Sequence, residues 1–327
     1  MIRLTTELLR ANASAYAASG EWVRLADLLA RHEELTSADG ELATLRAEAQ
    51  LRTGRPREAR EWLTKVLHTV ERSGDRRSLR RSLNLRGVAE LEVGQLEDAE
   101  RTFAKVLDLA HNDADALLTA RALNNLGALA DMRDRFDEAI ALYQRAIPSY
   151  QRLGDIRGLA ETHHNLAISL RHSGQHHEAE DHERQAISYA SESRNAALET
   201  LARLGLGELA LARGDSLLAE TMARHAAKRF VSSSDPVREA DALRVLGAAC
   251  LAQQKMGAAA EALEHACQLA VANGARLLEA EIRRLKSELL FVCGDTGQAK
   301  REATEAARLF EEAGSAAKAE EARRRAY

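Results

Sequence analysis

Histidines are concentrated in one short segment of this sequence, where imidazole chemistry would be expected. Six of the eleven histidines lie within twenty residues: His163, His164, His172, His176, His177 and His182. His177-Glu178 followed by His182 is close to the HExxH zinc motif, but the second histidine comes one residue too late to share a helical face with the first. A surface metal or a pH-sensitive patch is an alternative. The residues favour a solvated or partner-facing cluster, and we predict no metal site.

Asparagines recur in successive segments at intervals of about forty residues: Asn84, Asn124-Asn125 and His164-Asn165. Asparagine is a poor helix-interior residue because its amide competes for backbone hydrogen bonds. Its retention in three segments therefore indicates a use, either in binding or in contacts between the segments. An amide both donates and accepts, so it can satisfy the backbone of an extended peptide without reading its side chains.

A local basic stretch breaks the near balance of charge, which is -4 for the whole chain. Residues 52–86 hold eleven Lys and Arg against four Asp and Glu, and they include Arg76, Arg77, Arg80 and Arg81. Like charges spaced four apart on a helix repel each other. Either acids of a neighbouring segment, such as Glu41 or Glu48, compensate them, or Arg76, Arg77 and Arg80 anchor an acidic segment of a partner.

Motifs for catalysis and nucleotide binding do not emerge from the sequence. The segment 205–210, GLGELA, formally matches the dinucleotide-binding pattern GxGxxA, but that motif needs a preceding strand and a helix N-terminus. Here it lies inside a helical pattern, where its glycines serve packing. No nucleophile–base pair accompanies it, so we predict no enzyme and no cofactor.

The composition indicates an all-α chain. Only 4% of the 327 residues are aromatic and three are proline, which fits poorly with sheet-built domains. The three cysteines, Cys250, Cys267 and Cys293, give no disulfide framework and fall on apolar stripes as small core residues. There is no transmembrane span, no secretory signal and no global basic excess, so we expect a cytoplasmic protein that binds neither membrane nor nucleic acid directly.

Small residues repeat along the chain with a period that positions these side chains. Glycines stand at twenty-residue intervals: Gly54, Gly74, Gly94, Gly154, Gly174, Gly214, Gly274, Gly294 and Gly314. Alanines stand at forty-residue intervals: Ala59, Ala99, Ala139, Ala179, Ala219, Ala259 and Ala299. The glycines predict helix ends, and the alanines predict close helix packing. Two helices thus form a hairpin that repeats every forty residues and must stack on its neighbours to bury its apolar face.

The residues within one hairpin resemble a known repeat family. Leu126-Gly127 followed by Phe136, Ala139, Tyr143 and Ala146 is similar to the tetratricopeptide repeat signature. The forty-residue period resembles the longer-helix branch found in kinesin light chain and in bacterial peptide receptors and signalling regulators. The early tryptophan of the family is absent, and Arg46 replaces a usual leucine in the first repeat.

This resemblance implies a right-handed α-solenoid whose first helices line a concave groove. We expect seven repeats over residues 36–315, a weaker capping hairpin over 1–35 and a short cap or tail over 316–327. In the forty-residue branch, an asparagine just before the Leu-Gly pair often binds the ligand backbone, and Asn125 and Asn165 match that place. Asn84 and Asn124 lie one residue earlier. The expected groove residues are Arg81, Asn84, Arg121, Asn124, Asn125, His164, Asn165 and Arg171.

The function that the sequence predicts is a non-catalytic scaffold that binds a peptide or helix of another protein, with an acidic segment as one option. The alternative is a sensor or regulatory module of a bacterial signalling or transcription-regulator system, because similar arrays form parts of such proteins. The sequence leaves self-association into a homo-oligomer open.

Overall fold

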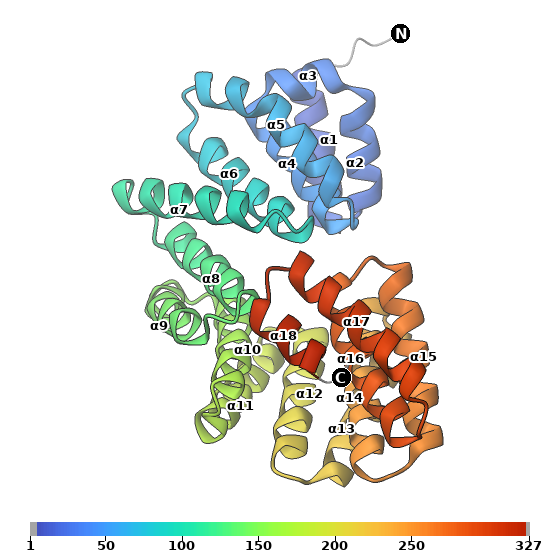
Figure 1. The fold of residues 1–327 in the computed structure, drawn as a ribbon. Coiled ribbons are helices and arrows are strands. Elements are labelled where there is room, and N and C mark those ends of the chain that lie inside the picture. Colours follow the sequence, from blue (N-terminus) through green and yellow to red (C-terminus); the bar gives the residue numbers. More distant parts are fainter. Residues whose placement is uncertain (1–4, 325–327) are drawn as a thin grey trace. The chain divides into compact units, whose positions relative to one another are not determined.

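The computed structural model describes residues 5–324, which contain eighteen α-helices and no strand (Figure 1). The helices are α1 (Thr6–Ser19), α2 (Trp22–Arg31), α3 (Glu33–Ala38), α4 (Gly40–Arg52), α5 (Pro56–Arg72), α6 (Arg76–Glu92), α7 (Leu96–Asn112), α8 (Ala116–Met132), α9 (Phe136–Leu153), α10 (Ile156–His172), α11 (His176–Glu192), α12 (Ala196–Ala212), α13 (Ser216–Ser232), α14 (Pro236–Ala252), α15 (Met256–Ala272), α16 (Arg276–Val292), α17 (Thr296–Glu312) and α18 (Ala316–Arg324). The predicted all-α fold class is confirmed. None of these helices is both long and apolar enough to cross a membrane.

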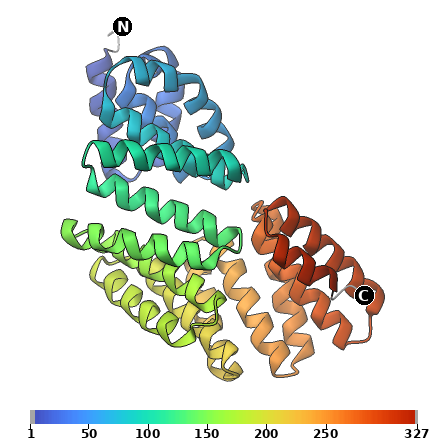
Figure 2. The same ribbon diagram turned by 60° about the vertical axis from the view of Figure 1, so that its left-hand side comes forward.

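The chain forms two compact units, residues 1–129 and 130–327. Within each unit, consecutive helices pack against each other as antiparallel neighbours (Figure 2). The first helices of successive repeats also contact one another: α4 with α6 in the first unit, and α10 with α12, α12 with α14 and α14 with α16 in the second. This is the stacking of an α-solenoid, and it brings the first helices together in one layer.

Left-handed residues end the helices at the predicted twenty-residue intervals. Every glycine of the series has positive φ, for example 82° at Gly94 and 87° at Gly214. The five positions of the series that lack glycine are also left-handed, with φ from 52° to 59°: Ala114, Asp134, Arg194, Ser234 and Gln254. The spacing therefore fixes the turn even where a side chain makes the conformation less favourable.

Aspartate side chains cap the N-termini of several of the helices that follow these turns. The carboxylate of Asp155 accepts a hydrogen bond from the Gly158 amide at 2.9 Å, and that of Asp295 accepts one from the Gln298 amide at 2.9 Å. Asp75 and Asp215 cap α6 and α13 in the same way. Each carboxylate thus satisfies backbone amides at the start of the next helix, as an N-cap does.

The small-residue columns lie in the core, as predicted. Ala99, Ala139 and Ala179 are fully buried, and Gly87 faces the buried ring of Phe103 so closely that a Cβ atom there would come within 2.5 Å of it. Cys250 and Cys267 are buried, but Cys293 is exposed. The prediction for Cys293 was wrong because this residue is the C-cap of α16, where the preceding Phe291 and Val292 are exposed as well.

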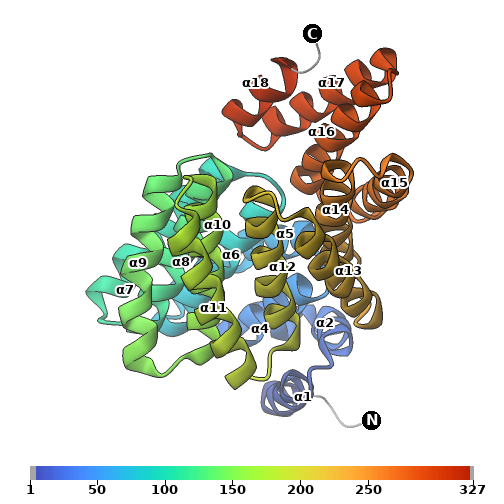
Figure 3. The ribbon, with the colours of Figure 1, turned by 90° about the horizontal axis from the view of Figure 1, so that it is seen from below.

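The last helix, α18, packs beside α17 (Figure 3). Ala319 and Ala322 of α18 bury against a cluster that includes Phe310 and Ala280. The hydroxyl of Ser315 also donates to the backbone carbonyl of Met132 at 2.7 Å, so the start of α18 is bonded to the end of α8 within the second unit.

Candidate peptide-binding surface

The amides of two predicted groove residues meet in the first unit. Asn125 Nδ2 on α8 donates to Asn84 Oδ1 on α6 at 3.2 Å, and both side chains are half-buried. Asn124 is half-buried on α8, and Arg121 is exposed on the same helix. The sequence placed Asn84 one position away from Asn125 in the repeat, and the structure nevertheless joins their side chains.

Most of the basic residues of α6 have carboxylate partners within the first unit. Arg76 lies 2.9 Å from Asp113, and Arg80 pairs with both Asp113 and Asp115. Arg81 pairs with Glu48, the acid that the compensation hypothesis named. Arg77 is exposed at the start of α6. The structure therefore supplies neighbouring acids for Arg76, Arg80 and Arg81.

His164 forms an internal pair in the second unit. Its Nδ1 lies 2.9 Å from Glu183 on α11, and both side chains are nearly or fully enclosed. Burial disfavours the charged form of both groups. For Glu183 burial prevails and raises the pKa of the carboxyl group. For His164 burial would lower the pKa of the imidazole, but the nearby Glu183 carboxylate outweighs it and raises that pKa. Gly205 makes this pair possible, because a Cβ atom at that position would come within 1.9 Å of the Glu183 carboxylate.

His163 points into the interior rather than toward solvent. It is 3% exposed, its Nδ1 lies 2.8 Å from Nδ1 of His182, and its ring stacks on Tyr189. Burial, with a smaller effect of His182, lowers the pKa of His163 to about 4. The expectation of a solvated histidine cluster was therefore wrong for His163 and His164, because they lie on the buried side of α10. No group of three or more metal-ligating side chains occurs in the described part of the chain.

An ionic network runs along the first helices of the second unit. Glu208 on α12 accepts from Arg171 on α10 at 2.9 Å and from Arg244 on α14 at 2.7 Å. Arg244 also pairs with Asp241 at 2.7 Å and faces Glu281 on α16 at 3.7 Å. Burial opposes these charges, but the two arginines lower the pKa of Glu208, and the three carboxylates raise that of Arg244 well above its usual range. Glu208 and Arg244 therefore stay charged, whereas burial raises the pKa of Asp241.

This network lines a concave surface in the second unit. One cavity of about 440 Å³ extends over α10, α12, α14 and α16 and is bordered by α17 and α18. A smaller cavity of about 260 Å³ shares Arg171, Glu208, Arg244 and Arg284 with it. Of the predicted groove residues, Arg171 thus lies in the concavity. Asn165 is half-buried on α10.

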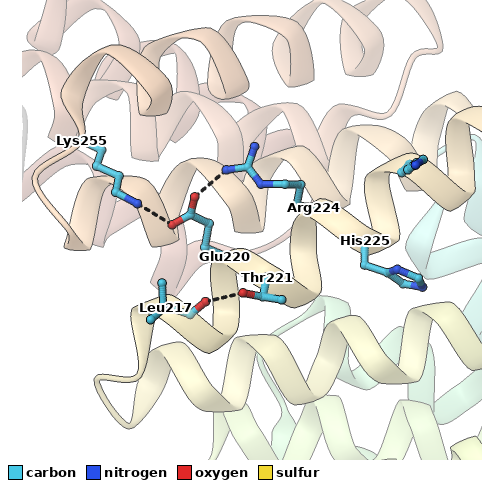
Figure 4. Close-up of a pocket in the computed structure, with 7 residues that line it drawn as sticks. Leu217, Glu220, Thr221, Arg224, His225 and Lys255 are labelled. Atoms are coloured by element: carbon cyan, nitrogen blue, oxygen red, sulfur yellow. Dashed lines mark hydrogen bonds and ion pairs between the residues drawn. The ribbon is translucent and has the colours of Figure 1, made fainter.

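A further cavity, of about 390 Å³, lies on α13, the second helix of its repeat (Figure 4). Its basic side chains surround one carboxylate: Glu220 accepts from Lys255 and from Gln253, each at 2.8 Å, and also pairs with Arg224. These hydrogen bonds lower the pKa of Glu220 to about 2. Glu220 thus satisfies Lys255 and Arg224, which links α13 to the start of α15 and contributes to local stability.

Comparison with known families gives a direct match to the repeat. One model of the tetratricopeptide repeat matches residues 78–152 and 118–192, and a second matches residues 204–275, together more than half of the chain. The chain belongs to the tetratricopeptide repeat family. The resemblance inferred from Leu126-Gly127 and the residues that follow it is confirmed. No curated protein matches this tetratricopeptide repeat chain in sequence.

Solved structures share the fold at low sequence identity. A Rap protein complexed with competence and sporulation factor has a TM-score of 0.67 and 15% identity, covering 98% of this chain and 97% of its own. Aspartyl phosphate phosphatase F from Bacillus subtilis has a TM-score of 0.66 and 12% identity, with coverage of 81% and 70%. A signal transduction ATPase with a tetratricopeptide repeat sensor from Pyrococcus horikoshii has a TM-score of 0.64 and 15% identity, covering 92% of this chain and 47% of its own.

Sequence reasoning missed three residues of the concave surface, Glu208, Arg244 and Arg284, and also Glu183, the buried partner of His164. A signal for two of them was present. One position of the forty-residue repeat reads, in order, Asn84, Asn124, His164, Leu204, Arg244 and Arg284. Continuing this series past His164 would have identified Arg244 and Arg284 as candidates for the concave surface. Nothing comparable marks Glu183, whose place depends on the space left by Gly205.

Proposed function

We propose that this tetratricopeptide repeat protein is a non-catalytic scaffold of the cytoplasm, and that its concave surface binds a peptide or helical segment of a partner protein. The observation that carries the proposal is the cavity of about 440 Å³ formed by the first helices α10, α12, α14 and α16. Ligand sites are typically concave and combine apolar walls with a few polar groups. Ile168 and Leu277, both half-buried, provide apolar surface beside the ionic side chains.

The asparagines extend this proposal to backbone recognition. Asn84, Asn124, Asn125 and Asn165 lie on first helices and are half-buried, so their amides sit near the surface without being fully solvated. An amide at such a place offers a donor and an acceptor to an extended backbone. The hydrogen bond between Asn125 and Asn84 uses one donor and one acceptor and leaves capacity on both groups.

The sites proposed for an acidic partner differ in how well their charges are balanced. Arg76 and Arg80 already contact Asp113, so a partner carboxylate there would compete with an internal one. Arg77 and Arg121 are exposed side chains that could reach a partner from the rim. We therefore assign these two arginines a supporting role in charge attraction rather than in specific docking.

A double substitution tests the groove. Asn125→Ala with Asn165→Ala is expected to weaken capture of the native partner from the host about tenfold or more, because each amide would contribute about 1 kcal/mol of hydrogen bonding. Asn112→Ala is the matched control, since Asn112 is exposed at the end of the second helix α7. Circular dichroism checks that each variant stays folded. A folded double variant with unchanged affinity for every partner contradicts the groove assignment.

A second candidate function is a sensor module. The likeness to the Pyrococcus horikoshii protein, whose repeats form a sensor joined to an ATPase, favours it. Such a module would bind the same kind of ligand but pass the binding on to another domain. A nucleotide-binding or DNA-binding segment encoded beside this sequence would support the sensor, and an operon without one would support the scaffold.

A further inference from the structure

The cavity of about 440 Å³ in the second unit has α18 as one of its walls. Its lining comes from the ends of α8 and α10, from α12, α14 and α16, and on one side from Lys318 and Glu321 of α18. The half-buried side chain of Leu277 on α16 lines the cavity and packs against the cluster that holds Ala319 and Ala322 of α18. This helix therefore covers part of the concave surface.

Polar contacts hold the start of α18 against a part of the chain that is distant in sequence. The buried hydroxyl of Ser315 donates to the backbone carbonyl of Met132 at 2.7 Å, across 183 positions (Figure 1). The last carbonyls of a helix have no partner within it, so this bond satisfies a group that α8 leaves free. Lys318 donates to Glu281 on α16 at 3.1 Å and lies 4.0 Å from Asp134 in the turn after α8. Thus α18 spans from α17 to the end of α8.

Apolar packing adds little to these contacts. Within α18 only Ala319 and Ala322 are buried, and a helix of nine residues is marginal on its own. The neighbouring α17 buries six side chains, among them Leu309 and Phe310. We therefore expect α18 to open at a lower free energy than α17, as the moving segments of proteins usually do.

The closed position of α18 also carries a cost at Asp134. Both oxygens of this carboxylate are buried without a hydrogen-bond partner among residues 5–324, and the ammonium of Lys318 is the cation that faces them. Burial raises the pKa of Asp134, and the charge of Lys318 opposes this shift only in part. A buried polar group without a hydrogen bond destabilises the state that encloses it. Opening of α18 would return this carboxylate to water.

We propose that α18 is a strap that closes one side of the concave cavity, and that it must leave Met132 and Asp134 before a peptide or helix can lie along the first helices of the second unit. The strap itself follows from the contacts of α18, whereas the nature of the ligand rests on the proposed peptide-binding function. A ligand that needs the open state binds more weakly in proportion to the fraction of molecules that are closed. Weakening the strap should therefore raise affinity without adding a contact.

Labelling of a thiol placed beside α18 measures the opening without any ligand. The full chain carries Leu277→Cys together with Cys293→Ser, which removes the exposed native thiol and leaves two buried ones. Adding Ser315→Ala and Lys318→Met is expected to raise the rate of reaction with fluorescein maleimide about tenfold, because a hydrogen bond and an ionic contact are lost. Equal rates with and without these two substitutions would overturn the strap.

Controls separate opening of the strap from loosening of the solenoid. Arg324→Gln removes a pair with Glu320 within α18 and should leave the labelling rate unchanged. A thiol at the exposed position of Arg301 on α17, introduced as Arg301→Cys, should react equally fast with the strap intact or weakened. Hydrogen exchange in the weakened chain should accelerate in residues 316–324 but not in α17. Equal acceleration in α17 would make α18 a structural cap and contradict the proposal.

A selected peptide then tests what the strap controls. Peptides are selected from a random phage library on the chain with Ser315→Ala and Lys318→Met, and one is synthesised whose binding is blocked once Leu277→Cys is labelled. Its dissociation constant should be about tenfold lower for the weakened chain than for the wild type. Equal affinity for both chains would show that the ligand enters past a closed strap, and the inference would be wrong. If no such peptide is enriched, the proposed peptide binding in this cavity fails, while the labelling rates still decide whether α18 opens.

Discussion

The two units use the same repeat position for different chemistry. In residues 1–129 this position holds Asn84 and Asn124, whereas in residues 130–327 it holds His164, Leu204, Arg244 and Arg284. The backbone at these places is alike, since each residue lies inside a first helix of seventeen residues. The repeat period thus determines where a side chain stands on its helix, and the local residue determines whether that place is apolar, neutral or charged.

The two units also differ in how much their surface side chains are expected to contribute to the stability of the fold. The amides of Asn84 and Asn125 share one neutral hydrogen bond of 3.2 Å. The second unit instead encloses a network in which Glu208 serves two arginines on different helices. Removing one member of an enclosed ionic network leaves charges without partners, which costs more than the loss of a neutral hydrogen bond.

The largest expected effects come from the cores of the two units. Phe103→Ala in the first unit and Phe230→Ala in the second should each lower the free energy of unfolding by about 3 to 5 kcal/mol, because both rings are buried. Urea unfolding measures the loss. Hydrogen exchange should place it mainly in α6–α8 for Phe103→Ala and in α12–α14 for Phe230→Ala.

Phe291→Ala is the control for both, since this ring is 64% exposed and its loss should change stability by about 0.5 kcal/mol or less. Equal loss of protection throughout the chain for both core variants would show that the two units unfold as one. The comparison between separate units would then hold for the surface but not for stability.

The next effect concerns the ionic network alone. Glu208→Gln keeps the shape of the side chain but removes the charge shared by Arg171 and Arg244, and we expect a loss of about 2 kcal/mol. This figure is below that for an isolated buried pair because Arg244 retains Asp241. Glu199→Gln on the same helix breaks only a surface pair with Arg203 and should cost about 0.5 kcal/mol or less. Equal costs in chemical unfolding would mean that the network does not stabilise the second unit.

These contrasts show what the sequence could predict. The helix ends, the left-handed turns and the packing columns follow from local conformational and steric rules. These rules repeat along the chain, so the spacing of residues such as Gly94 and Ala99 was enough to predict them. The partners of charged side chains depend on which turns of different helices face each other. The pairing of Arg81 with Glu48 could be named among alternatives, but the enclosure of His164 with Glu183 required the space above Gly205, which no spacing in the chain reveals.

The histidines of the second unit predict a pH dependence of its stability. Because the pKa of His163 falls to about 4 on folding, the unfolded chain binds a proton between pH 6.5 and 4 that the folded chain does not. Stability should therefore fall by about 1 to 2 kcal/mol from pH 6.5 to pH 5 through this residue. His182, whose pKa burial also lowers, acts in the same direction.

His164 acts with the opposite sign. Its pKa is raised on folding, so its contribution is present below pH 6.5 and is lost as the pH rises through the higher folded value. Stability of α10 and α11 should therefore fall on acidification through His163, and fall on alkalinisation through His164 and through Glu183, whose pKa burial raises. Hydrogen exchange at several pH values measures both arms. His163→Phe keeps the ring beside Tyr189 but cannot titrate, and it should flatten the acid side of the profile. An unchanged acid side would assign the effect to other groups.

The smallest expected effect tests whether the amide pair of the first unit serves stability or binding. Asn84→Ala and Asn125→Ala should each cost about 1 kcal/mol or less, with a coupling energy of about 0.5 kcal/mol in a double-mutant cycle, because the bond is neutral and half-buried. The same cycle measured on partner affinity should give larger losses than the one on stability. If the amides are kept for contacts between repeats, the order reverses: stability changes most, and affinity follows only through unfolding. If instead the affinity losses are the larger, binding explains why two residues that are unfavourable inside a helix stand at these positions.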